Sequence, residues 1–201
     1  MDLTSGVLIL IILIFSAILH EVAHGYVADR LGDPTARLLG RLTLDPRKHI
    51  DPFMSILLPM LLTLSSSPVI FGAAKPVPID PFNLKDGRKD VALVSLAGPL
   101  TNITIAVLAS LLFKILLPLT PFPLLSLLEL VVRLNLLLAI FNLLPLPPLD
   151  GSKVFALTLP EKEANAYLSL GSIGIFILFF LLLFPLGGFS LGNFIFNLLQ
   201  V

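Results

Sequence analysis

The chain has 201 residues, of which 56% are hydrophobic and 13% are charged, and its mean hydropathy is +1.00. A typical globular chain is about 25% charged, so this sequence cannot cover a water-facing surface and is not that of a soluble domain. The formal net charge of +0 provides no basic field for nucleic acid. Cysteine is absent, which excludes disulfides and thiolate metal sites.

These properties predict an all-α polytopic membrane protein with about five to six transmembrane helices and one re-entrant or extended element. Each crossing needs about 20 residues, so we expect no separate extramembrane domain. We predict a single integral-membrane domain over residues 1–201, with its functional core at about 5–155 and C-terminal helices at about 166–199.

The first apolar run, from Leu3 to about Leu31, stops at Gly32, a residue that favours a helix end, and is predicted to be one long helix. The second run, at about residues 52–71, is interrupted by Pro59 and by a Ser-Ser-Ser-Pro stretch. Further apolar segments are predicted at residues 91–117, 124–144 and 167–184, followed by a short apolar tail at 186–199.

Basic residues constrain the topology of these segments. Three loops carry positive charge, whereas the loop between the third and fourth segments carries none. Positive charge marks the cytoplasmic side of short loops, so residues 52–71 are predicted to enter and leave by the same face. Non-helical backbone at membrane depth is tolerated only in protein or beside a wet cavity, so this element indicates a functional cavity. The basic residues are Arg30, Arg37, Arg41, Arg47 and Lys48, then Lys75, Lys85, Arg88 and Lys89, then Lys153 and Lys162.

The first predicted helix contains the pattern H-E-x-x-H at His20, Glu21 and His24. The four-residue spacing puts both imidazoles on one helical face, within reach of one zinc ion, and places Glu21 beside a metal-bound water. His20 lies about 26 Å along the helix from Leu3, which predicts a site inside the hydrocarbon near its cytoplasmic edge. The alternatives are satisfied core histidines or side chains that reach to the interface. Ionisable groups inside a membrane are costly, however, and favour a functional role.

A catalytic zinc site normally has three protein ligands and one position for water. Asp150 is the strongest candidate for the third ligand, because the prolines of Pro145–Pro148 end the fourth helix and let the chain turn a carboxylate back towards the metal. If residues 52–71 are re-entrant, two crossings separate His24 from Asp150, and both lie at the same face. The alternative for Asp150 is an ordinary Asp-Gly turn in a solvated loop.

Other polar residues lie in or near the membrane segments. Glu129 and Arg133 are spaced to form an ion pair on the fourth helix, which we interpret as structural. His49 lies in a basic loop and is expected at a loop or interface position rather than as a further ligand. Asn102 is expected to hydrogen-bond between helices close to the site, and we include it among the candidate substrate-binding residues.

Four stretches together resemble the site-2 protease family of intramembrane zinc metalloproteases, peptidase family M50, in its compact prokaryotic form without a PDZ domain. They are HEVAHGYVADRLGD, FGAAKPVPI, AGPLTN and NLLPLPPLDG, within about residues 5–155. The resemblance implies a zinc metalloendopeptidase with one Zn²⁺ per chain. It implies His20, His24 and Asp150 as ligands and Glu21 as general base.

The same resemblance implies that Asn142 helps to hold the oxyanion or the substrate backbone. The candidate substrate-binding segment comprises Lys75, Pro76, Val77 and Pro78, and its prolines suit an extended conformation. The implied reaction is hydrolysis of peptide bonds within or near the transmembrane segments of single-span, membrane-anchored proteins. The implied location is the cytoplasmic membrane, with the active site near the cytoplasmic side. The sequence predicts no oligomeric state.

Two other interpretations remain open from the sequence. A transporter of divalent metal would also place His, Glu and Asp inside the membrane, but it would need ligands along a path open to both faces. The outer half of the chain offers only Glu129 and Arg133 for such a path. A catalytically inactive membrane scaffold is the third interpretation.

Overall fold

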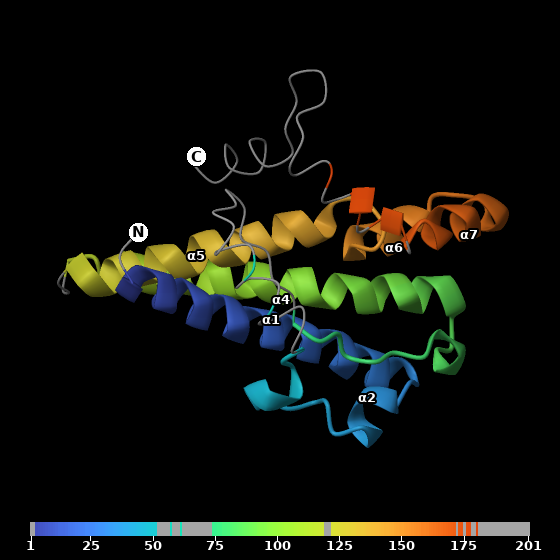
Figure 1. Ribbon diagram of the computed structural model, residues 1–201, viewed down its shortest axis with the longest axis horizontal. Coiled ribbons are helices and arrows are strands. Elements are labelled where there is room, and N and C mark those ends of the chain that lie inside the picture. Colours follow the sequence, from blue (N-terminus) through green and yellow to red (C-terminus); the bar gives the residue numbers. More distant parts are fainter. Residues whose placement is uncertain are drawn as a thin grey trace, which may run out of the picture.

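A computed structural model describes residues 3–51, 57, 61, 74–118, 122–171, 173, 174, 176, 177 and 180 of the chain (Figure 1). The predicted re-entrant element at 52–71, apart from residues 57 and 61, lies outside the described residues. So does the apolar tail at 186–199, and the fifth predicted segment at 167–184 lies partly outside them.

The described part of the chain is helical, as predicted, and it contains three helices long and apolar enough to cross a membrane. These are α1 (Leu3–Leu31), α4 (Gly87–Leu116) and α5 (Phe122–Leu143). The prediction for the first helix is confirmed, and those for the third and fourth segments are confirmed to within a few residues. The full count of five to six spans and the single-domain assignment stay predictions.

Figure 1 shows α1 and α5 running in one direction, with α4 antiparallel to them. The α4 helix packs against both of the others. Its buried positions include the small residues Gly98, Ala106 and Ala109, and small residues let helix backbones approach closely where lipid supplies no hydrophobic drive. The close approach brings the middle of α1 against the middle of α4.

Short elements cluster at the end where α1 finishes and α4 begins (Figure 1). Gly32 ends α1 in the left-handed region, with φ at 118°, a conformation that glycine adopts without steric cost. The elements at this end are α2 (Thr35–Leu38), η3 (Pro81–Asn83), α6 (Asp150–Ala156) and α7 (Glu161–Ser169), whereas η1 (Pro46–Lys48) lies nearer the middle of α1.

Candidate metal centre

Two histidines of α1 lie one turn apart on the face that packs within the bundle. His20 and His24 are both buried, and their Nε2 atoms are 3.0 Å from each other. Because α1 is helical throughout this stretch, the four-residue spacing aligns both imidazoles on one side of the helix.

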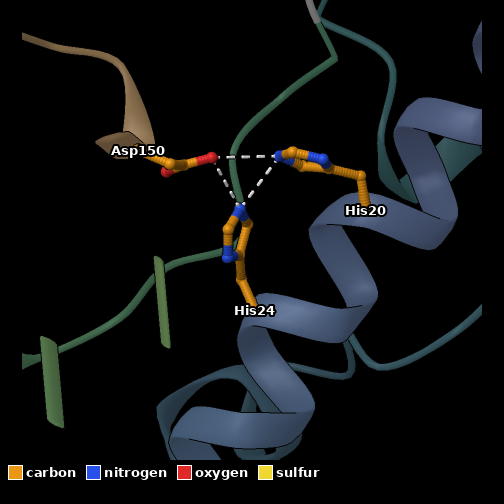
Figure 2. A group of neighbouring side chains, drawn as sticks. All are labelled: His20, His24 and Asp150. Carbon is orange, nitrogen blue, oxygen red and sulfur yellow. Dashed lines mark hydrogen bonds and ion pairs between the residues drawn. The ribbon is translucent and has the colours of Figure 1, made fainter. Parts of the chain in front are cut away.

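A carboxylate from a distant part of the chain joins the two imidazoles. The α5 helix ends at Leu143, and the proline-containing residues 144–149 leave the helix before Asp150 begins α6. The Oδ2 atom of Asp150 lies 3.2 Å from Nε2 of His20 and 3.2 Å from Nε2 of His24 (Figure 2). Within the part of the chain that the structure describes, these three residues are the one group of His, Asp and Glu side chains suited to a metal ion.

The far side of each imidazole is fixed by a hydrogen bond that determines the tautomer. His24 donates from Nδ1 to the carbonyl oxygen of Val94, 2.7 Å away. His20 donates from Nδ1 to Oδ1 of Asn102, 2.6 Å away. In a neutral imidazole one ring nitrogen is the donor and the other carries the lone pair. Each histidine therefore presents the lone pair of Nε2 to the centre of the group.

A second amide fixes the orientation of the first. Asn102 donates from Nδ2 to Oδ1 of Asn135, and Asn135 donates from Nδ2 to the carbonyl oxygen of Val131. Because a carbonyl oxygen can only accept, this last bond sets the orientation of both amides and leaves Oδ1 of Asn102 facing His20. Both asparagines are 0% exposed. The chain of bonds thus joins α5, α4 and α1 behind one imidazole.

These contacts leave three hydrogen-bond acceptors facing one another: two imidazole nitrogens and a carboxylate oxygen. Acceptors at such distances repel unless a metal cation, or a proton carried by an imidazole, lies between them. Ligands about 2.0–2.1 Å from a tetrahedral zinc ion lie about 3.3 Å from each other, and the separations here are 3.0 and 3.2 Å. The residues present therefore fit a zinc ion by charge, by atom type and by spacing.

Gly98 of α4 keeps space open beside the two imidazoles. A Cβ atom at this position would lie 2.5 Å from Nε2 of His20 and 2.5 Å from Nε2 of His24. Any other residue would therefore place carbon against the nitrogen atoms that must face a metal. The absence of a side chain at position 98 is what the proposed metal site requires.

The Glu21 side chain contacts a different part of the chain. Its Oε2 atom accepts a hydrogen bond of 2.8 Å from the main-chain N–H of Val77. Val77 belongs to residues 75–80, which run without regular secondary structure beside α1 and which we call the strap. The side chains of Lys75 and Pro76 are exposed, whereas Val77 is buried.

Side chains and backbone at both ends hold the strap in place. Arg41 donates to the carbonyl oxygens of Lys75 and Pro76, and the N–H of Lys75 donates to the carbonyl oxygen of His49. At the other end, the N–H of Asp80 donates to the carboxylate of Asp33 over 2.7 Å. Several backbone groups of the strap are therefore used within the chain and are not offered to a substrate.

The carboxylate of Asp33 accepts hydrogen bonds from several neighbouring groups. Asp33 is 0% exposed and accepts further hydrogen bonds from Thr35 and from the side chain of Asn83. Burial raises the pKa of the Asp33 carboxyl, but the hydrogen bonds from Thr35, Asp80 and Asn83 outweigh this and hold the pKa below its ordinary value. The carboxylate therefore stays ionised, and the strap stays anchored, throughout the neutral range.

The two predicted asparagines make their described hydrogen bonds within the chain. Asn102 is fully buried and forms the predicted hydrogen bonds between helices close to the site, to His20 and to Asn135, whereas its part in substrate binding stays a prediction. Asn142 donates to the carbonyl oxygen of Leu138 on its own helix. Neither Asn135 nor the role of Gly98 beside the imidazoles was predicted from the sequence. An amide within an apolar span was the signal that could have found Asn135.

The remaining polar residues have structural surroundings. Arg133 and Glu129 form the predicted ion pair on α5, with both side chains about half exposed. His49 lies in the loop, as predicted, where it is buried and donates from Nε2 to the carbonyl oxygen of Thr43. Neither His49 nor the ion pair belongs to the metal-binding group.

Comparison with known proteins gives a consistent result. The model of Peptidase family M50 matches residues 119–185. YwhC of Bacillus subtilis strain 168 is 37% identical over 190 residues, which cover 91% of this chain and 83% of the relative. Rip2 of Mycobacterium tuberculosis H37Rv is 33% identical over 180 residues, which cover 89% of this chain and 67% of the relative. Rip2 of Mycolicibacterium smegmatis is 31% identical over 182 residues, which cover 90% of this chain and 69% of the relative.

All three relatives are named as candidate zinc metalloproteases. No solved structure matches the chain significantly. The relatives give no support to the transporter interpretation, and their names agree with the donor set described above. The chain belongs to the site-2 protease family of zinc metalloproteases, peptidase family M50.

Proposed function

We propose that this protein hydrolyses peptide bonds within or near the transmembrane segments of membrane-anchored proteins. In this proposal His20, His24 and Asp150 hold one zinc ion per chain, and Glu21 is the general base. The observation that carries the proposal is the convergence of three acceptor atoms, 3.0 to 3.2 Å apart, inside a bundle of membrane-type helices.

Zinc in such a site supplies a Lewis acid that polarises a carbonyl and makes a water acidic enough to attack near neutral pH. The protein contributes the geometry and the proton transfers. Glu21 takes a proton from the attacking water and then passes it to the leaving amine nitrogen. Asn102 and Val94 hold the imidazoles, since their oxygen atoms accept from the Nδ1 atoms. Asn142 stays a candidate for holding the oxyanion once substrate is bound.

The substrates proposed are single-span membrane proteins. A peptide bond in an intact transmembrane helix is hydrogen-bonded within the helix and shielded by side chains, so the substrate must unwind before hydrolysis. Because the substrate must unwind, helix-breaking residues in its span should promote cleavage.

The exposed side chains of Lys75 and Pro76 remain candidates for contact with the substrate.

The test uses the purified full chain in vesicles with a single-span reporter protein whose span contains a Gly-Pro pair. We expect cleavage in the span, loss of cleavage when a chelator removes zinc, and recovery when Zn²⁺ is added back. A matched reporter with Leu-Leu in place of Gly-Pro should be cleaved more slowly. Cleavage that is indifferent to metal removal, or zinc uptake into vesicles without any cleavage, would contradict the proposal.

We also propose that the protein spans the cytoplasmic membrane five to six times, with the active site near the cytoplasmic side. The exposed Lys85 precedes α4, whereas the exposed Leu117 follows it, and the charge pattern puts these positions on opposite faces. Because the chain has no cysteine, one introduced cysteine is the single thiol that a maleimide can label. A membrane-impermeant maleimide should label Leu117→Cys in intact cells, but Lys85→Cys only after permeabilisation. Labelling of Lys85→Cys in intact cells would contradict this topology.

A further inference from the structure

The strap reaches the proposed general base through a single main-chain group. The N–H of Val77 lies 2.8 Å from Oε2 of Glu21. Pro76 and Pro78 flank Val77, and proline has no N–H to donate. A shift of the strap by one residue would therefore face Glu21 with a nitrogen that cannot donate. The Pro-Val-Pro sequence therefore excludes this hydrogen bond in the two adjacent registers.

Gly25 of α1 leaves room for the side chain of Val77. A Cβ atom at position 25 would lie 2.7 Å from Cγ1 of Val77 and 2.9 Å from Cβ of Ala36. Because Gly25 has no side chain, the strap can lie directly against the helix one turn beyond Glu21. The side chain of Val77 is buried in this contact. The packing thus fixes how far the strap lies from α1.

The strap is fixed on both sides of Val77 by groups that do not touch the metal-binding group. Arg41, itself buried, holds the carbonyls of Lys75 and Pro76 on one side. The buried carboxylate of Asp33 holds the N–H of Asp80 on the other. The position of the Val77 N–H is therefore set by the surrounding fold rather than by Glu21 itself.

We propose that the main-chain N–H of Val77 is the positioning group for Glu21. This inference rests on the proposed function. The hydrogen bond holds one oxygen of the carboxylate, so that the other oxygen faces the attacking water in a fixed direction. The same bond persists after the proton is taken up, because Oε2 can accept while Oε1 carries the proton. The strap accordingly orients the base, and Arg41, Asp33 and Gly25 act through the strap.

The first test compares two variants of the full-length protein. Val77→Pro removes the N–H, whereas Val77→Ala keeps it, and both variants lose part of the packing against Gly25. Hydrogen bonds to charged groups are typically worth enough to change a rate by about 10- to 100-fold. We expect kcat of Val77→Pro on the single-span reporter to fall by about that factor below kcat of Val77→Ala, with similar KM and one zinc per chain in both. Equal kcat values would overturn the proposal.

A second measurement needs neither substrate nor metal. With ¹³C-labelled proline and ¹⁵N-labelled valine, only Pro68-Val69 and Pro76-Val77 give Pro-Val signals in this sequence, and Val77→Ala identifies the second. We expect Glu21→Ala to speed hydrogen exchange of the Val77 amide at least about tenfold. Glu21→Gln keeps an acceptor oxygen and should preserve protection. Unchanged exchange in Glu21→Ala would overturn the proposal even if Val77→Pro failed to fold.

The outcomes separate this inference from the proposed function. A zinc-loaded wild type that cleaves no membrane reporter would contradict the proposed function. Hydrogen exchange of the Val77 amide would then still test whether the bond to Glu21 is formed. An active wild type whose Val77→Pro and Val77→Ala variants share one kcat would contradict only the positioning role.

Discussion

Glu21→Gln should abolish proteolysis while the protein keeps its zinc. General-base catalysis contributes about 10²- to 10⁴-fold to a rate, and an amide cannot take the proton from the attacking water. The amide oxygen can still accept from the Val77 N–H, so the strap should keep its place. Cleavage of the reporter in vesicles measures the rate, and elemental analysis measures one zinc per chain.

The matched control is Glu129→Gln, which makes the same chemical change on α5. Glu129 pairs with Arg133 and lies outside the metal-binding group, so this variant should cleave at close to the wild-type rate. A Glu21→Gln protein that cleaves as fast as the wild type would exclude Glu21 as the base.

Gly98→Ala should strongly weaken zinc binding. The added methyl group would lie 2.5 Å from Nε2 of both His20 and His24, which is closer than real Cβ contacts allow. Neither imidazole can retreat without losing its hydrogen bond to Val94 or Asn102. We therefore expect about one hundredth of the wild-type zinc affinity, at the strong end of the about 10- to 100-fold that metal-site perturbations cost. Competition with a chromogenic chelator measures the affinity.

Gly171→Ala is the control for this second prediction. A Cβ atom at position 171 would meet only the Cβ atom of Pro148, at an ordinary distance of 3.9 Å. This variant should bind zinc as the wild type does. If Gly98→Ala binds one zinc per chain with unchanged affinity, the space beside the imidazoles is not where the metal lies.

Local patterns in the sequence were sufficient to predict the three long helices α1, α4 and α5. The bounds of α1 follow from an apolar run that stops at a glycine, and the prolines after Leu143 account for the end of α5. The approach of Asp150 to His20 and His24 could be anticipated because a helix-breaking segment precedes the aspartate and a topology argument puts both on one face.

Contacts between distant parts of the chain could not be predicted in the same way. The bond from Asn102 to Asn135 and the bond from Val77 to Glu21 join residues 33 and 56 positions apart. Neither has a local signature, because an asparagine in a span or a valine between prolines suits several environments. The expectation that Lys75–Pro78 pairs with substrate did not foresee that Arg41 and Glu21 already engage part of its backbone.

The most direct test is zinc X-ray absorption spectroscopy on the purified full-length protein. We predict one zinc per chain with nitrogen and oxygen ligands about 2.0–2.1 Å away, together with the outer-shell signal of two imidazoles. It also predicts loss of this signal in His20→Ala and a changed ligand shell in Asp150→Ala. A zinc ion without imidazole ligands, or a spectrum unchanged in both variants, would contradict the proposed metal centre.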